Sequence, residues 1–237
     1  MTLADILTEL RRHAEESAEG RHAHTGTWVC AVLRERIAAG QLAPGSKLSE
    51  EALCEALGVS RNTLREAFST LAAEHVITRI PNRGVFVSLP TADDIRELYR
   101  VRRYLEPAAI AWSSTTDFQA LHGAIERAQV ARDAGSVPGM AGANQDFHAA
   151  VVALAGSERL NLLMMQVLAE MRLVFHSMVA NPVFHAPYVE DNARILGLLE
   201  ADRRGEAAAL MADYLGRAEE QLLEALADDD ARTRRAG

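Results

Sequence analysis

The chain has 237 residues, of which 49% are hydrophobic and 24% are charged, a balance typical of a folded globular protein rather than of a disordered one. Its 33 acidic side chains outnumber the 25 lysines and arginines, and this net charge of −8 argues against a protein that coats nucleic acid without regard to sequence. The chain has no run of about 18 apolar residues and no secretory signal, so we expect neither a membrane span nor export from the cytoplasm.

The first predicted elements are two helices and a turn. Residues 1–24 form an N-terminal extension, in which the spacing of apolar residues over 3–19 favours a short helix. Residues 27–40 favour a second helix closed by Gly40, and Pro44-Gly45 then predicts a turn. Cys30 and Cys54 form no CxxC motif, so we expect both to be reduced, as is usual inside the cell.

Two further helices follow on either side of a tight connection. Ser49 is placed to cap a short helix over 50–57, and Ser60 to cap a helix that begins at Arg61. At 100° per residue, the second of these helices divides into two faces. Leu64, Ala67, Phe68 and Leu71 lie on the apolar face, and Arg61, Asn62, Arg65 and Ser69 lie on the polar face.

A strand–turn–strand pattern completes this region, with Arg83 and Gly84 at the tip of a two-stranded hairpin. Helix, helix, tight turn, helix and hairpin together predict a winged helix-turn-helix over residues 25–90, with the hairpin as the wing. In that arrangement the last helix enters the major groove of DNA, while Ser60 contacts phosphate and the wing tip reaches the minor groove. An isolated RxxxR pair is more often a solvated face, but this context favours DNA reading. The predicted DNA-binding residues are Ser60, Arg61, Asn62, Arg65, Arg83 and Gly84.

Charge is distributed unevenly along the chain. Residues 25–90 carry seven Lys or Arg and six Asp or Glu, whereas residues 91–237 carry 15 and 22. A nearly neutral segment with a few placed arginines can bind DNA, and the acidic remainder is repelled by phosphate.

Several motifs resemble the DNA-binding domain of the GntR family of bacterial transcription regulators. They are G-x-L-x-P-G-x-x-L-S-E, L-G-V-S-R, L-R-E-A and R-G-x-x-V, all within residues 40–87. The segments DDIRELYRVRRYLEPAAIAWS and NQDFHAAV further resemble the FadR-like, or FCD-type, effector domain of that family. The resemblance implies a homodimer that binds a palindromic operator and holds a small metabolite, often a carboxylic acid, in its helical domain.

Residues 91–229 favour a bundle of about six helices, the first capped by Thr91, and residues 230–237 read as a flexible tail. No strand pattern or phosphate-binding loop interrupts these residues. The fold class is therefore mainly α, with a winged helix-turn-helix before an all-α effector-binding and dimerisation domain. The remaining predicted helices of the bundle cover 116–134, 142–155, 157–180, 186–202 and 204–227.

The family often binds a metal ion with one Asp and three His, and we compared each position with this chain. The Asp position falls on Asn144, two of the His positions fall on Asn192 and Tyr214, and only His148 matches. Amides and a phenol are poor ligands beside one imidazole, so we expect no metal and no other cofactor. We expect His148 to be a hydrogen-bonded histidine of a pocket or of the core rather than a metal ligand.

The same residues could hold a polar ligand without metal. Arg102 resembles an inward-facing arginine of the family, and it needs an anionic partner, which is either the effector or an internal carboxylate such as Glu106. Arg172 is a second candidate arginine. The predicted effector-binding residues are Arg102, Asn144, His148, Arg172, Asn192 and Tyr214.

The sequence thus predicts a DNA-binding transcriptional regulator, expected to be a repressor, whose operator affinity depends on a small metabolite, with organic acids favoured. One alternative is a constitutive regulator with a degenerate effector site. Another is a metal-dependent enzyme in the helical bundle. An enzyme would need a metal-ligand set or a paired acid and base, and the sequence supplies neither.

Overall fold

The computed structural model describes residues 6–12, 26–38, 41–176 and 182–236. The chain divides into two compact units, Met1–Pro90 and Thr91–Gly237.

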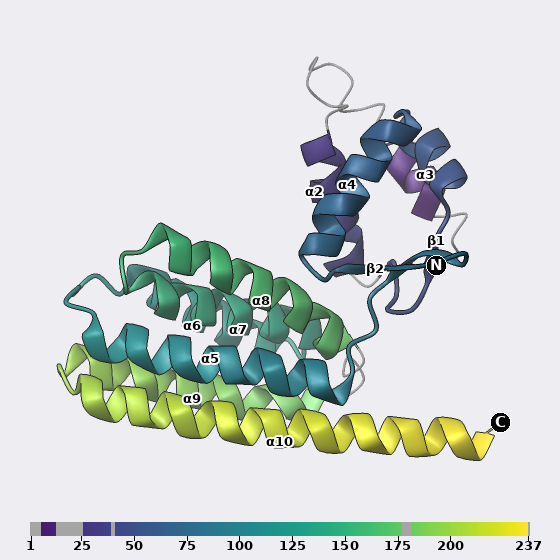
Figure 1. The fold of residues 1–237 in the computed structure, drawn as a ribbon. Helices are drawn as coiled ribbons and strands as arrows, with labels where there is room; N and C mark the ends of the chain where they lie inside the picture. The colour runs from purple at the N-terminus through teal and green to yellow at the C-terminus, as the bar shows by residue number, and fades with distance from the viewer. Residues whose placement is uncertain (1–5, 13–25, 39–40, 177–181, 237) are drawn as a thin grey trace. The chain divides into compact units, whose positions relative to one another are not determined.

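The N-terminal unit is a winged helix-turn-helix (Figure 1). Its helices are α2 (Gly26–Ala38), α3 (Glu50–Leu57) and α4 (Arg61–Ala73). Ser49 and Ser60 cap α3 and α4 as predicted, because each side chain accepts a hydrogen bond from the backbone N–H three residues later. Gly58 ends α3 with φ of 64°, and this left-handed turn is what allows α4 to follow so closely.

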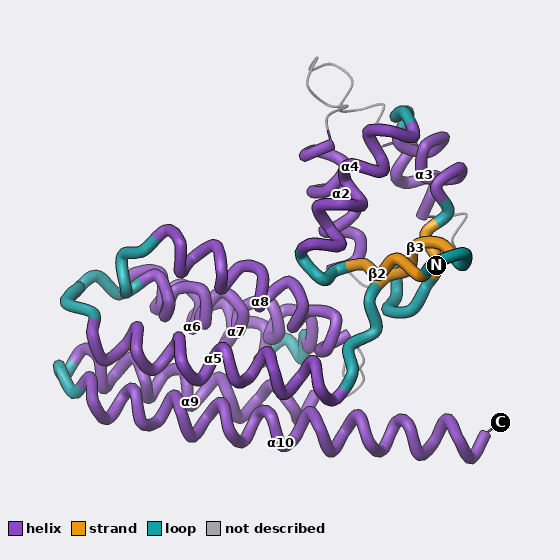
Figure 2. The backbone as a smooth tube through the Cα atoms, viewed as in Figure 1, coloured by secondary structure: helices purple, strands orange, loops and turns teal. Residues whose placement is uncertain are grey.

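The wing is a three-stranded antiparallel sheet rather than the expected two-stranded hairpin. Strands β2 (Ile77–Ile80) and β3 (Gly84–Val87) form the hairpin, and β1 (Lys47–Leu48) pairs with the other edge of β3 (Figure 2). β1 has only two residues beside a Pro-Gly turn, which is too short for an alternating pattern to appear in the sequence.

A short helix over residues 6–12 belongs to this unit. Leu10 is fully buried, and ion pairs join Arg11 to Glu55 on α3 at 2.8 Å and Glu9 to Arg36 on α2 at 2.7 Å. The helix expected over 3–19 is therefore present in its central part, and the rest of that range lies outside the described residues.

The C-terminal unit is an all-α bundle, with six helices in its described part. They are α5 (Ala92–Trp112), α6 (Gln119–Asp133), α7 (Val137–Ala153), α8 (Glu158–His176), α9 (Pro182–Glu200) and α10 (Arg204–Ala236). α5 packs against α7, α8 and α10, and α6 packs against α7 and α9, so the long helices lie side by side (Figure 2). The predicted flexible tail is wrong as to secondary structure, because the last helix continues past residue 229.

α5 begins at the predicted cap residue, Thr91, and ends at an exposed tryptophan. Thr91 and Asp94 form a capping box, in which the Thr91 side chain accepts from the Asp94 N–H and the Asp94 carboxylate accepts from the Thr91 N–H. At its other end, Trp112 is 87% exposed.

No helix among the described residues is long and apolar enough to span a membrane.

Candidate nucleic-acid interface and effector site

The start of α4 presents polar side chains to solvent while its other face is buried. Leu64, Phe68 and Leu71 are fully buried against the rest of the unit, as the helical spacing predicts. Arg61 and Asn62 are exposed, and neither side chain makes a hydrogen bond or ion pair with any described residue. Their donors and acceptors are therefore open to an external partner such as a base edge.

Ser60 sits at the N-cap of this helix. Its Oγ accepts from the Thr63 N–H at 3.1 Å and lies 2.9 Å from the Thr63 hydroxyl. The remaining N–H groups of the first turn point out of the helix end, where they favour an anion such as phosphate.

Arg65 is exposed like Arg61, but it has partners within the unit. Its Nε donates to Glu50 Oε2 on α3 at 3.1 Å, and its backbone carbonyl accepts from Ser69 Oγ at 2.8 Å and from Arg79 Nη2 at 3.0 Å. Arg79 Nη2 also donates to Ser69 Oγ at 3.0 Å. Arg65 is thus the point at which α3, α4 and the wing strand β2 meet.

Arg79 was missed by the sequence analysis. It lies on β2, is exposed, and adds a third guanidinium beside the polar face of α4. Strict alternation would place it on the same face as the buried Ile77, so the sequence pattern did not indicate its exposure. Its placement against Arg65 and Ser69 depends on how the sheet packs on α4, which no local pattern encodes.

The wing tip has the geometry expected of a tight hairpin. The Arg83 N–H donates to the Ile80 carbonyl at 3.0 Å, and Asn82 adopts φ of 60°. Gly84 has φ of 112°, and a Cβ there would lie 3.2 Å from Lys47 Cε, so only glycine fits without strain. The Arg83 side chain is exposed and makes no hydrogen bond with the described residues.

In the C-terminal unit, five of the six predicted effector-binding residues meet in one buried cluster. Arg102 lies on α5, Asn144 and His148 on α7, Asn192 on α9 and Tyr214 on α10. All five are at most 8% exposed. Four helices therefore bring together five positions that were selected from the family resemblance.

Glu106 on α5 completes this buried cluster and is fully buried. Its carboxylate accepts from Arg102 Nε at 2.7 Å and lies 2.6 Å from His148 Nδ1. It is the internal carboxylate that the sequence analysis left open as a partner of Arg102. The guanidinium of Arg102 also lies over the Tyr99 ring, at 4.9 Å from its centre.

Burial and neighbouring charges shift the pKa values of three side chains in the buried cluster. Burial raises the pKa of the Glu106 carboxyl, but Arg102 and His148 lower it by more, so its pKa is below the usual range. Burial lowers the pKa of His148 and outweighs the opposing effect of Glu106. Burial likewise raises the pKa of Tyr214 well above its usual range. Near neutral pH the cluster thus holds a charged Arg102–Glu106 pair with a neutral imidazole and a neutral phenol.

The hydrogen-bond partners of His148 and Tyr214 indicate where their protons lie. Nδ1 of the neutral His148 faces the Glu106 carboxylate, an acceptor, so Nδ1 carries the proton. The Tyr214 hydroxyl donates to Asn144 Oδ1 at 2.9 Å, and its oxygen lies 3.1 Å from His148 Nε2. Asn144 Oδ1 accepts in addition from Asn192 Nδ2 at 2.9 Å.

Two polar atoms of the buried cluster remain without a partner among the described residues. They are Arg102 Nη2, a cationic donor, and Asn192 Oδ1, an acceptor. Buried polar atoms are rarely left unpaired, because each costs about 1–3 kcal/mol. Arg102 Nη2 could donate to an anionic oxygen, and Asn192 Oδ1 could accept from a donor.

Arg172 is not part of the buried cluster. Its side chain is exposed on α8, and Nε donates to Gln145 Oε1 at 2.5 Å. The structure gives Arg172 no hydrogen bond to the other five predicted residues among those described, and its Nε is bound to the buried Gln145 instead.

The buried cluster does not fit the metal site of the resembling family. Its only His and carboxylate are His148 and Glu106, and the carboxylate is already bound to Arg102. Among the described residues, no group of three His, Cys, Asp or Glu side chains could hold a metal ion. Amide and phenol oxygens supply no negative charge to offset the loss of water from a divalent ion.

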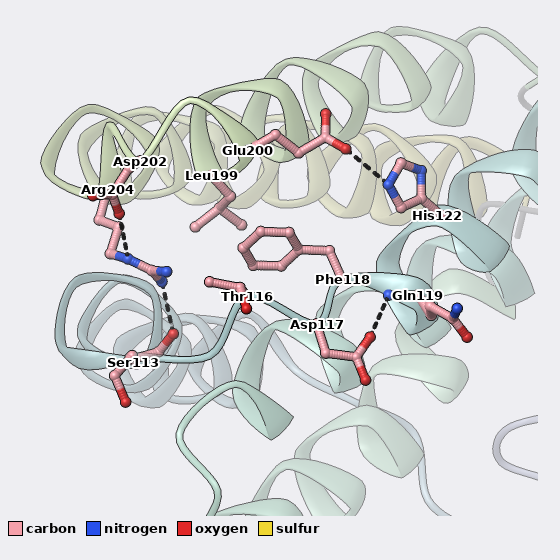
Figure 3. A pocket seen from close by; sticks show the side chains of 11 residues that line it. Ser113, Thr116, Asp117, Phe118, Gln119, His122, Leu199, Glu200, Asp202 and Arg204 are labelled. Carbon is pink, nitrogen blue, oxygen red and sulfur yellow. Dashed lines mark hydrogen bonds and ion pairs between the residues drawn. The ribbon is translucent and has the colours of Figure 1, made fainter.

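An open cleft of about 1110 Å³ lies between the segment after α5 and the start of α10 (Figure 3). Arg204 in its wall donates to Ser113 Oγ and to the Thr115 carbonyl, both at 2.8 Å, and His122 lies 2.9 Å from Glu200. These polar groups satisfy one another and hold the segment after α5 against the start of α10. The cleft is therefore a less specific candidate than the buried cluster.

Comparisons with known proteins match a different family model to each of the two units. Residues 27–87 match the model of the "Bacterial regulatory proteins, gntR family", and residues 97–217 match that of the FCD domain. A putative transcriptional regulator GntR from Rhodococcus sp. RHA1 is 40% identical, with a TM-score of 0.80 over 84% of this chain and 97% of that one.

Two curated relatives are more distant or match a smaller part. The gluconate operon transcriptional repressor of Bacillus licheniformis is 40% identical over 35% of this chain and only 34% of its own length. The regulator McbR of Escherichia coli is 25% identical over 73% of this chain and 81% of its own length. These proteins are transcriptional regulators and not enzymes.

Proposed function

Since the chain belongs to the GntR family of bacterial regulatory proteins and carries an FCD domain, it is a DNA-binding transcriptional regulator rather than an enzyme, and we propose that it is a metabolite-controlled homodimeric repressor. In this proposal it acts in the cytoplasm on a palindromic operator in double-stranded DNA. The single observation that carries the DNA-binding role is the Ser60-capped start of α4, where Arg61 and Asn62 are exposed and their side chains bind no described residue. The sign of regulation is supported by the N-terminal match to the gluconate operon repressor.

The proposed two-fold symmetry is supported by the size of one recognition helix. One α4 covers only a half-site, and a dimer with a two-fold axis matches an inverted repeat. Selection from a random 30-base-pair duplex library, followed by footprinting, tests this directly. We expect an inverted repeat protected by a dimer, and protection of one asymmetric site by a monomer would contradict the proposal.

The effector site of the proposal is the buried cluster. Arg102 Nη2 supports an anionic ligand, and Asn192 Oδ1 supports a donor on the same molecule, which together favour an organic acid bearing a hydroxyl or amine. The match to the gluconate repressor covers the N-terminal part of the chain and does not bear on the effector.

A thermal-shift screen of organic acids tests the effector role. A ligand of the native state raises the unfolding midpoint in proportion to RT ln(1 + [L]/Kd), and we expect a hit to change operator affinity as well. The Asn192→Ala variant should respond less to that acid than the wild type. If no acid shifts the midpoint and operator binding is independent of metabolites, the constitutive alternative is the better description.

The proposal also holds that no transition metal is bound stoichiometrically. Elemental analysis of protein purified without added metal should find none, and about one zinc, nickel or manganese per chain, lost in His148→Ala, would contradict this. Restoring the family pattern with Asn144→Asp, Asn192→His and Tyr214→His should create metal affinity, because it supplies a carboxylate and two imidazoles beside His148. A folded triple variant without metal would show that at least one position is wrongly placed.

A further inference from the structure

Glu50 is the feature of the DNA-binding unit that the proposed function does not yet use. It lies in the first turn of α3, and Oε2 of its carboxylate accepts the Arg65 Nε–H at 3.1 Å. Neither Nη group of Arg65 makes a hydrogen bond with a described residue. The carboxylate therefore binds the inner nitrogen of the guanidinium and leaves the two outer nitrogens open.

This division of donors suits base reading. A guanidinium recognises guanine with two parallel N–H groups directed at O6 and N7. When Nε–H is held by a carboxylate, the plane of the guanidinium is set, and the two Nη groups form the available pair. We propose that Glu50 is a positioning residue that orients Arg65 for bidentate recognition of guanine; this rests on the proposed DNA-binding function.

Both ends of Arg65 are held. Ser69 and Arg79 bind its backbone carbonyl, while Glu50 binds its side chain. A long side chain that is already ordered loses less conformational freedom when it binds. Arg65 therefore begins its encounter with DNA in one orientation, whereas Arg61 has no such partner among the described residues.

The Glu50–Arg65 ion pair is expected to contribute little to the stability of the fold. Its side chains are 58% and 35% exposed, and exposed ion pairs contribute little to stability because water screens them. A carboxylate near the recognition helix also repels phosphate, which weakens binding to any DNA. Bound DNA excludes that water, so the same carboxylate then holds the guanidinium more firmly.

Glu51 provides a matched control. It is the next residue in the first turn of α3, is exposed, and makes no hydrogen bond or ion pair with a described residue. Alanine at position 50 or 51 removes the same charge from the same helix terminus. Only the change at position 50 removes the partner of Arg65.

Sequencing of duplexes selected from a random 30-base-pair library compares the wild type with Glu50→Ala, Glu50→Gln and Glu51→Ala in the full chain. We expect Glu50→Ala to reduce the preference for the guanine lost in Arg65→Ala by about fivefold or more, the lower end of what a bidentate pair discriminates. Glu50→Gln keeps an acceptor for Nε–H and should restore most of the preference. Glu51→Ala should keep the wild-type motif, although both alanine variants should bind unselected duplex DNA more tightly.

A double variant shows whether Glu50 acts through Arg65. In an Arg65→Ala background, Glu50→Ala should not change the motif further. A further change would mean that Glu50 reads DNA itself, for instance by accepting from cytosine, and would overturn the inference. An unchanged motif in Glu50→Ala alone would also overturn it, whereas the absence of any wild-type motif would defeat the proposed function itself.

Discussion

At the scale of single residues, the proposed function predicts that Arg61 and Arg65 of α4 read bases, whereas Arg83 of the wing contributes charge. Arg61→Ala or Arg65→Ala should cost about 1–3 kcal/mol of operator binding and relax the base preference at one position per half-site, because a bidentate guanine contact carries that much discrimination. Affinities for the selected duplex and for its single-base variants measure both effects. If Arg65→Ala weakens binding to every duplex equally, Arg65 contacts phosphate and not a base.

A second residue-scale prediction concerns pH and His185. His185 is 3% exposed beside the Phe175 and Phe184 rings, and burial lowers its pKa to about 4. In the unfolded chain His185 is protonated below about pH 6.5, whereas in the folded chain it stays neutral down to about pH 4. The free energy of unfolding therefore falls as the pH drops from 6.5 towards 4. At pH 5 the loss is about 2 kcal/mol relative to pH 8.

His185→Leu isolates this contribution. The variant should lose less stability between pH 8 and pH 5 than the wild type in chemical unfolding. A smaller slope of the same sign should remain, because the pKa of His148 is also lowered by burial. Equal slopes for wild type and variant would show that His185 reaches solvent in the native state.

At the scale of elements, α5 is the helix on which the buried cluster is built. Arg102 and Glu106 are one turn apart on it, and Glu106 reaches His148 on α7. Glu106→Ala should destabilise the C-terminal unit by about 3–5 kcal/mol, because it leaves a buried guanidinium without its carboxylate.

The exposed pair on the same helix serves as the control. Glu97 pairs with Arg100, and both side chains are 61% exposed. Glu97→Ala should cost less than about 1 kcal/mol in the same denaturant titration. A similar loss for both variants would mean that the buried pair is no more important to stability than a surface pair.

Local elements were predictable from the sequence, and the reason is physical. Ser49, Ser60 and Thr91 bond to backbone three residues away, so the information needed for a cap lies within one turn. Strand β1 was missed because its pairing with β3 joins residues 37 and 39 positions apart. The buried cluster was predictable only through the family resemblance, since no helical period indicates which faces of four helices will meet.

The misplaced Arg172 illustrates the same limit. Periodicity places it on α8, but its neighbours on that helix include the buried Met171 and Leu173. A position on the boundary between the inner and outer face can point either way, and packing of the neighbouring helices decides. Arg79 was missed for the converse reason, because a strand residue acquires its role from a helix that precedes it by several residues.

At the scale of the whole molecule, binding to DNA must overcome an overall charge of −8. Each cationic contact to phosphate contributes about 0.9 to the slope of log affinity against log salt. Arg83→Ala should therefore reduce that slope by about 1.8 for a dimer, and weaken binding to all sequences alike.

Arg203 is the matched control for that measurement. It is an exposed arginine of the C-terminal unit and pairs with Glu206. Arg203→Ala changes the net charge by the same amount but should leave the salt slope unaltered. Equal effects of the two substitutions would mean that net charge, rather than a contact at the wing tip, governs the salt dependence.

The chain contains two tryptophans, and the fold assigns one to each compact unit. Trp28 is half-buried in α2 of the N-terminal unit, and Trp112 is 87% exposed at the end of α5 in the C-terminal unit. Replacing either one with phenylalanine leaves a single fluorophore, so each unit can be observed by its own emission within the intact protein. The solvated indole of Trp112 should emit at longer wavelength and be quenched more readily by iodide than that of Trp28. Unfolding curves from the two variants would then report whether the DNA-binding and effector units melt together or in succession.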